Sequence, residues 1–147
     1  MGTILIGVDG SDLAREAAMS ARELLGPGHT WELVAAVSPH EEPQTSVVGR
    51  LDRPVLSDDV IDDHRREAQE HALEIGRMLD LQGEVQVTTG EPGPVICQSA
   101  QELGADLIVV GSHGRGSIGR VLLGSVSRFV LEHAPCPVMV HRLRPNG

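Results

Sequence analysis

The sequence of 147 residues contains no lysine, so all 12 of its strongly basic side chains are arginines. This absence excludes a Walker A loop and every mechanism that depends on a catalytic or phosphate-binding lysine. Acidic side chains number 21, and the formal net charge at pH 7 is −9. Such a charge argues against nonspecific binding to nucleic acid or to an anionic membrane surface. An anionic ligand must therefore be held by local donors, because the overall field repels it.

Cysteines and long apolar runs are also scarce. The two cysteines, Cys97 and Cys136, lack the spacing of metal ligands and are interpreted as reduced thiols. No apolar run approaches the roughly 20 residues that a membrane span requires. At the N-terminus, Asp9 interrupts the first apolar run and no charged segment precedes that run, which argues against a signal peptide. We therefore expect a cytoplasmic protein without a membrane or nucleic-acid partner.

Short apolar runs alternate with amphipathic segments along the whole chain. Strands are expected at residues 3–8, 31–37, 84–88, 106–110 and 137–141, and helices at 12–25, 58–81, 94–103 and 124–134. Strands that alternate with helices predict a parallel sheet covered on both faces. The expected fold is a single α/β domain over residues 1–147: a doubly wound, Rossmann-like sheet of five parallel strands in the order 3-2-1-4-5. The polar segment 38–57 is expected to form a long loop.

The segment 111–127 is rich in glycine and joins the fourth expected strand to the fourth expected helix. Glycines let the backbone approach an anion closely, and the free N–H groups of a first helical turn point at it. In a sheet of order 3-2-1-4-5, ligands bind where the first and fourth strands diverge. The turn Asp9-Gly10-Ser11 follows the first strand and reaches the same crevice. The sequence therefore predicts a nucleotide site between these two turns.

The same segment fits the pattern G-x-x-G-(nine residues)-G-[ST] through Gly111, Gly114, Gly124 and Ser125. Together with Val-Asp-Gly-Ser at 8–11 and Pro-Cys-Pro-Val-Met-Val at 135–140, this motif resembles the universal stress protein family. The resemblance covers nearly the whole chain. It implies ATP as the ligand, accompanied by Mg²⁺, and a homodimer paired through the last strand from Val138 to His141.

The resemblance also implies a role for individual residues. Asp9 would contact the ribose or the metal, and Val37 would offer its backbone near the adenine. The residues implied for nucleotide binding are Asp9, Gly10, Ser11, Val37, Gly111, Gly114, Arg115, Gly124, Ser125, Val126 and Ser127, with Asp9 as the metal ligand. Arg115 and Arg120 lie within the glycine-rich segment and flank the expected site, and we expect them to offset part of the phosphate charge.

Three classes of function stay open. The protein could be an ATP-binding regulator in a stress response, a slow ATPase or autophosphorylating enzyme, or a dimeric interaction module with an incidental pocket. The first is favoured because fast phosphoryl transfer needs preorganised cations and an oriented nucleophile, and the sequence offers no lysine and no evident base with a partner. No catalytic residue is assigned, and His113 is interpreted as a loop residue without a chemical role.

Four further residues carry structural expectations. His64 and His71 lie seven positions apart, unlike the i, i+4 spacing of metal ligands, so both are expected to pack on a helix face. Trp31 begins the second strand and is expected far from the ligand. Proline at Met139 is expected to weaken the dimer by removing a hydrogen-bond donor from an open sheet edge.

Overall fold

The computed structural model describes residues 1–9, 12–40, 54–112 and 123–142. In these ranges five parallel strands form one sheet, in the order β3-β2-β1-β4-β5. The strands are β1 (Thr3–Val8), β2 (Thr30–Val37), β3 (Val85–Thr89), β4 (Leu107–Gly111) and β5 (Val138–His141), and the helices are α1 (Asp12–Leu25), α2 (Asp58–Met78), α3 (Pro92–Leu103) and α4 (Ser125–His133). The predicted fold class and strand order are confirmed.

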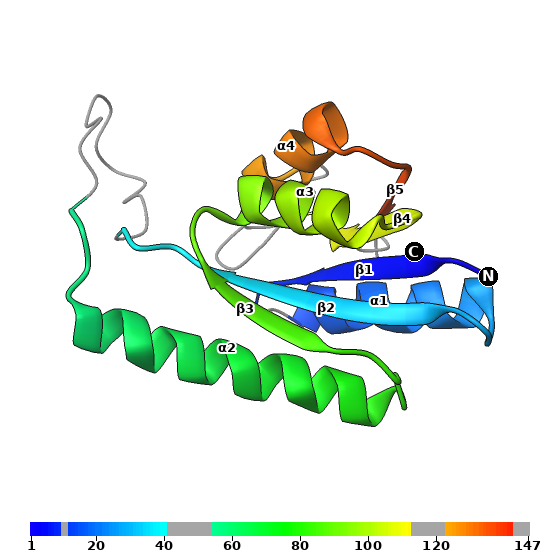
Figure 1. Cartoon of the computed structure of the whole chain (residues 1–147), viewed down its shortest axis with the longest axis horizontal. Helices are drawn as coiled ribbons and strands as arrows, with labels where there is room; N and C mark the ends of the chain where they lie inside the picture. Colours follow the sequence, from blue (N-terminus) through cyan, green and yellow to red (C-terminus); the bar gives the residue numbers. More distant parts are fainter. Residues whose placement is uncertain (10–11, 41–53, 113–122, 143–147) are drawn as a thin grey trace, which may run out of the picture.

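Two helices cover each face of the sheet, with α1 and α2 on one side and α3 and α4 on the other (Figure 1). Successive residues of β1 enter opposite cores, so Ile4 and Ile6 pack toward α1 and α2 while Leu5 packs toward α3 and α4. Burial on both faces explains why the strands are continuous apolar runs rather than alternating ones. Trp31 is 2% exposed and pairs with Ile4 near the amino end of the sheet, as expected.

Helix α1 lies close to the sheet because its buried stripe is built from small side chains. Its four buried alanines are at most 2% exposed: Ala14, Ala17, Ala18 and Ala21. Helix α3 ends at Gly104, whose φ of 62° is the left-handed conformation that commonly terminates helices. This ending was predicted from the glycine.

The end of α2 was predicted wrongly. The helix stops at Met78 rather than at Leu81, because Asp80 takes a left-handed conformation with φ 49°. The N–H of Asp80 then donates to the carbonyl of Arg77 at 3.2 Å, and the N–H of Leu81 to that of Gly76 at 2.9 Å. These two bonds form a Schellman motif, in which glycine is usual and aspartate is not.

The expectation for His64 was also wrong, because this side chain is exposed. The buried residues of α2 are Ala72 and Ile75, both in its second half, and the first half presents mostly exposed positions. His71, in the second half, is partly buried. The apolar stripe expected along the whole helix is therefore fully buried only in the second half.

The direction of the backbone groups on β5 follows from its hydrogen bonds to β4. Ile108 N–H donates to the carbonyl of Pro137 at 3.0 Å, and Ser112 N–H donates to that of His141 at 2.8 Å. Because direction alternates along a strand, Met139 also points toward β4, and Val138 and Val140 point to the open edge. The expectation for a proline at Met139 is therefore wrong: the N–H removed would belong to the sheet and not to its edge.

Candidate functional site

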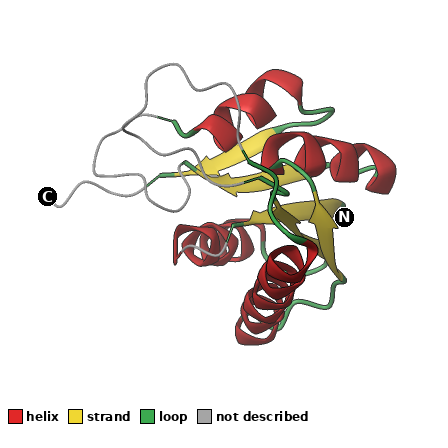
Figure 2. Cartoon of the chain, turned by 90° about the vertical axis from the view of Figure 1, so that its left-hand side faces the viewer, coloured by secondary structure: helices red, strands yellow, loops and turns green. Residues whose placement is uncertain are grey.

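The carboxyl ends of β1 and β4 lie side by side. Ile6 pairs with Val109, so the same register continued by two residues sets Val8 opposite Gly111. The exposed Asp9 follows β1, and the buried Ser112 follows β4. Helices α1 and α4 both begin at this end of the sheet, which Figure 2 views directly. N–H groups of a first helical turn lack partners inside the helix and carry partial positive charge, so this end suits an anion.

The predicted site residues that the structure describes gather at this end. Gly111 is the last residue of β4, Gly124 precedes α4, and Ser125, Val126 and Ser127 form the first turn of α4. Val37 is the last residue of β2. Gly10, Ser11, Gly114, Arg115 and also Arg120 lie outside the described residues, as does His113.

One carbonyl oxygen joins the end of β4 to the start of α4. The Ser112 oxygen accepts the N–H of Gly124 at 2.6 Å and the hydroxyl of Ser127 at 2.8 Å. The Ser127 Oγ also lies 3.1 Å from the Gly124 oxygen, and its single proton serves one of these acceptors at a time. Ser127 is only 1% exposed. The hydroxyl of Ser127, a residue that the resemblance implied for nucleotide binding, is thus directed into the protein, where it fixes α4 against β4.

A side chain at Gly111 would face α1, whereas the side chain of Ser125 faces solvent. A Cβ on Gly111 would lie 3.0 Å from the Leu13 Cγ, so the glycine lets α1 approach β4 closely. Ser125 is exposed at the first position of α4. Among the described hydroxyls of this turn, that of Ser125 is therefore the one that faces solvent.

A cluster that sequence reasoning missed lies where β2 and β3 end. The carbonyl of Val37 accepts the N–H of Gly90 at 2.9 Å, which brings the two departing segments together. The hydroxyl of Ser38 then donates to Glu91 Oε1 at 2.9 Å, and the same oxygen lies 3.3 Å from His40 Nδ1. Ser38 and Glu91 are 53 positions apart, so only the pairing of β2 with β3 could have brought them together in a prediction.

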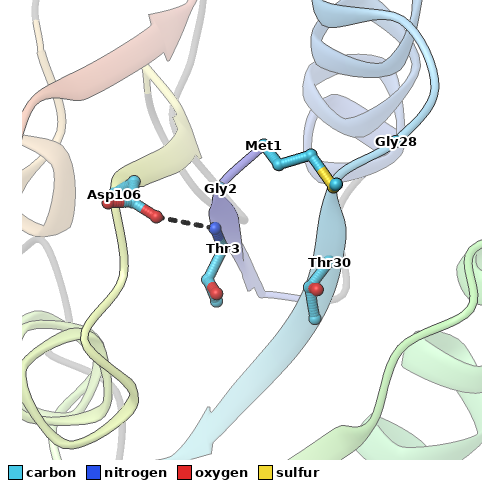
Figure 3. Close-up of a pocket in the computed structure, with 6 residues that line it drawn as sticks. All are labelled: Met1, Gly2, Thr3, Gly28, Thr30 and Asp106. Atoms are coloured by element: carbon cyan, nitrogen blue, oxygen red, sulfur yellow. Dashed lines mark hydrogen bonds between the residues drawn. The ribbon is translucent and has the colours of Figure 1, made fainter.

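A hollow of about 210 Å³ occupies the opposite end of the sheet (Figure 3). Its lining includes Thr3, Thr30 and Asp106, which stand at the amino ends of β1, β2 and β4. The carboxylate of Asp106 accepts the N–H of Thr3 at 2.8 Å. Helices α1 and α3 end on this side, so their carbonyls add negative potential to that carboxylate. The hollow is therefore unsuited to a phosphate.

Neither thiol is activated, and the described residues hold no preformed metal cage. Burial raises the pKa of the Cys97 and Cys136 thiols, helped at Cys97 by the nearby Cys136 and at Cys136 by the charge of Asp106. In the described part of the chain, no group of three or more His, Cys, Asp or Glu side chains is placed to hold a metal ion. Within the same ranges, no helix has the length and apolar character to cross a membrane.

Comparison with known proteins agrees with this architecture. The profile of the universal stress protein family matches residues 1–142. A universal stress protein of Thermus aquaticus is 33% identical over 142 residues, covering 95% of this chain and 98% of that protein. A shorter match to the Synechocystis universal stress protein Slr1101 is 44% identical over 62 residues and covers 42% of this chain and 57% of that protein.

A solved structure adds a ligand. The universal stress protein from Archaeoglobus fulgidus in complex with dAMP is 26% identical, with a TM-score of 0.60, and the match covers 95% of this chain and 96% of that one. The family profile spans almost all of the sequence, and the fold agrees with it. The chain therefore belongs to the universal stress protein family.

Proposed function

We propose that this protein binds an adenine nucleotide, with ATP and Mg²⁺ as its ligands, and acts in a stress response as a regulator without rapid turnover. One observation carries the proposal: the Ser112 carbonyl accepts the N–H of Gly124, which fixes the first turn of α4 at the end of β4, the strand that pairs with β1. The dAMP complex of the Archaeoglobus relative supports an adenine nucleotide. The two thiols, which are not joined in a disulfide, support the cytoplasm as the compartment.

The roles in this proposal follow from backbone chemistry. The N–H groups of Ser125, Val126 and Ser127 have no partner inside α4 and are assigned to the phosphates, together with the exposed hydroxyl of Ser125. Ser127 takes part through its main chain, because its hydroxyl is engaged with Ser112. These donors are local, as a protein of net charge −9 requires for an anionic ligand.

The remaining residues are assigned by position. By their place in the motif, Gly111 and Gly114 are assigned to the phosphates and Arg115 to offsetting their charge. Gly10 and Ser11 are assigned to the nucleotide beside Asp9. Val37 is assigned to the adenine. The side chain of Val37 is 6% exposed and its carbonyl is held by Gly90, so the base would lie against a fixed strand end.

Asp9 is assigned to Mg²⁺. Its carboxylate is exposed just beyond the end of β1, beside the proposed phosphate site. Mg²⁺ prefers oxygen ligands and commonly binds through one or two carboxylates together with substrate phosphates and water. A single aspartate therefore fits an ion that arrives with ATP, where it would neutralise phosphate charge.

A direct test is to purify the protein without added nucleotide, denature it and identify the released molecules by mass spectrometry. Calorimetric titration of the emptied protein with ATP, ADP and AMP, with and without Mg²⁺, follows. We expect a Gly124→Val variant to lose binding, because a branched side chain at the start of α4 blocks the approach of a phosphate. Gly76→Val in α2 is the matched control, since a Cβ on Gly76 meets no atom within 4 Å. Parent-like binding by Gly124→Val would reject the assigned site.

A further inference from the structure

The outward-facing backbone groups of β3 are identified by its hydrogen bonds to β2. Leu33 N–H donates to the carbonyl of Glu84 at 2.9 Å, and Gly90 N–H donates to that of Val37 at 2.9 Å. The even-numbered positions of β3 therefore face β2. Val85, Val87 and Thr89 direct their N–H and C=O groups to the open edge of the sheet.

The side chain of Arg65 lies along this edge. From α2, its Nη2 donates to the carbonyl of Val87 at 3.1 Å, and its Nη1 donates to the hydroxyl of Thr89 at 2.7 Å. An incoming strand would lie about 4.8 Å from β3 and would need that same carbonyl as an acceptor. The guanidinium occupies this space with a charge that a second strand would have to displace.

The sequence of β3 explains why such a cover matters. Val-Gln-Val-Thr-Thr is uncharged, lacks proline and is rich in β-branched residues, which is the composition of a strand that pairs with its own copy. Antiparallel pairing of two β3 strands would be symmetric, as in a twofold dimer. The occupant that this edge fits best is therefore a second copy of the same chain.

The other edge of the sheet is different. Val138 and Val140 of β5 point outward, and in the ranges that the structure describes no side chain is hydrogen bonded to their backbone groups. Charged side chains at an edge are a common way in which proteins prevent unwanted strand pairing. We propose that Arg65 closes the β3 edge to a second copy of this chain, which confines strand pairing between copies to the β5 edge.

The pairing of copies through β5 rests on the proposed homodimer, whereas the closure of the β3 edge by Arg65 does not. Arg65 also ties α2 to β3, so its loss alone would lower stability for a purely structural reason. Self-association is the property that separates the two roles. A residue that only anchors a helix changes the unfolding midpoint, whereas a residue that guards an edge changes the mass of the folded protein in solution.

Sedimentation velocity of the whole chain over a wide range of concentrations tests the proposal. We expect Arg65→Ala to add an association step that about doubles the mass of the parent species, whatever that species is. Arg66→Ala is the matched control, because it removes the same charge from the next position of α2. Arg66 is exposed, and among the described residues its guanidinium has Asp63 as its hydrogen-bond and ion-pair partner, at 3.4 Å. It should sediment like the parent.

A double variant locates the new contact. Val87→Pro removes an N–H that faces the open edge and not β2, so Arg65→Ala/Val87→Pro should lose the added step. Val140→Pro blocks the β5 edge and should leave the added step in place. If the parent is a monomer, the homodimer proposal fails. The Arg65 proposal is still tested, because Arg65→Ala should then form a dimer where the parent does not.

Two results overturn the proposal. The first is a folded Arg65→Ala protein, verified by circular dichroism, that sediments like the parent at every concentration. The second is an added step that survives Val87→Pro, since the contact would then lie elsewhere. Should Arg65→Ala fail to fold, Arg65→Gln keeps part of the side chain that packs along β3 and is judged by the same two results.

Discussion

The hydroxyl of Ser127 reaches back fifteen residues to the carbonyl oxygen of Ser112, at 2.8 Å. This bond fixes the helix that follows the glycine-rich segment to the strand that precedes it. Ser125, two positions earlier on the same turn, is exposed. Two serines of one motif therefore have different tasks: one holds the turn in place and the other faces the proposed ligand.

We expect Ser127→Ala to lower the free energy of unfolding by about 1 kcal/mol, the usual value of one buried hydrogen bond. The loss stays moderate because the Ser112 oxygen keeps its bond to Gly124 N–H. Ser125→Ala should change stability by less than about 0.5 kcal/mol, as exposed substitutions do. It should weaken ATP binding roughly tenfold, because a donor to a charged oxygen is lost. Urea unfolding and calorimetric titration of both variants give the four values needed.

The matched pair makes the outcome decisive. A Ser127→Ala protein of parent stability but with much weaker ATP binding would mean that this hydroxyl turns toward the ligand. Parent-like affinity in Ser125→Ala would remove its hydroxyl from the proposed phosphate contacts and leave only backbone donors.

The second prediction concerns the β5 edge. Val140→Pro removes an outward-facing N–H, so a homodimer that pairs through β5 loses one bond from each copy by symmetry. Two such bonds are worth about 2 kcal/mol, which corresponds to a roughly thirtyfold higher Kd of the dimer. The fold should persist, because the backbone groups of Val140 face away from β4. Analytical ultracentrifugation measures the Kd.

Met139→Pro is the contrasting variant, one residue away. The N–H of Met139 belongs to the ladder with β4, so this proline should destabilise the folded chain itself. Circular dichroism during thermal unfolding distinguishes the two effects. A dimer as tight in Val140→Pro as in the parent would place the interface on another surface.

These cases show which features could be predicted from the sequence. The apolar runs and the glycines predicted the strands and the end of α3, because burial on both faces leaves a local pattern. The strand order was taken from the usual arrangement of doubly wound sheets. The end of α2 left no such pattern, because Asp80 adopts a left-handed conformation that is usual for glycine. Whether the N–H of Met139 faces β4 or the open edge depends on which alternate residues of β5 are hydrogen bonded to β4. Composition does not determine this.

The residues that the sequence analysis missed, at the site and at the β3 edge, were missed because their contacts join distant segments of the chain. Ser38 and Glu91 meet only because β2 pairs with β3. In the sequence, nothing distinguishes Arg65 from another arginine of an amphipathic helix. Only the folded structure shows that its side chain lies at the open edge of β3. Ser127 was predicted within the right turn, yet its direction depends on where the helix docks. Contacts between distant segments require the tertiary structure, even when every element is predicted.

The last prediction concerns Glu32. In the folded protein the pKa of its carboxyl group is raised above the ordinary value of 4.5. Burial is the main cause, and the charge of Glu84, just before β3, adds to it. The Oε2 atom is buried without a hydrogen-bond partner among the described residues. A carboxyl with a raised pKa in the folded state binds its proton more tightly there than in the unfolded chain. It therefore lowers stability as pH rises from about 4.5 through the raised value.

Glu32→Gln removes the charge and keeps the shape, so we expect a higher unfolding temperature at pH 7. The gain should be about 1–2 °C, because the site is partly solvated and the interaction is screened. Below pH 4 the gain should vanish, since the parent carboxyl is then protonated in both states. Glu84→Gln should give a smaller gain, and the exposed Glu23→Gln none. A benefit that is equal at pH 7 and at pH 3.5 would attribute the effect to the amide itself and not to the removal of a buried charge.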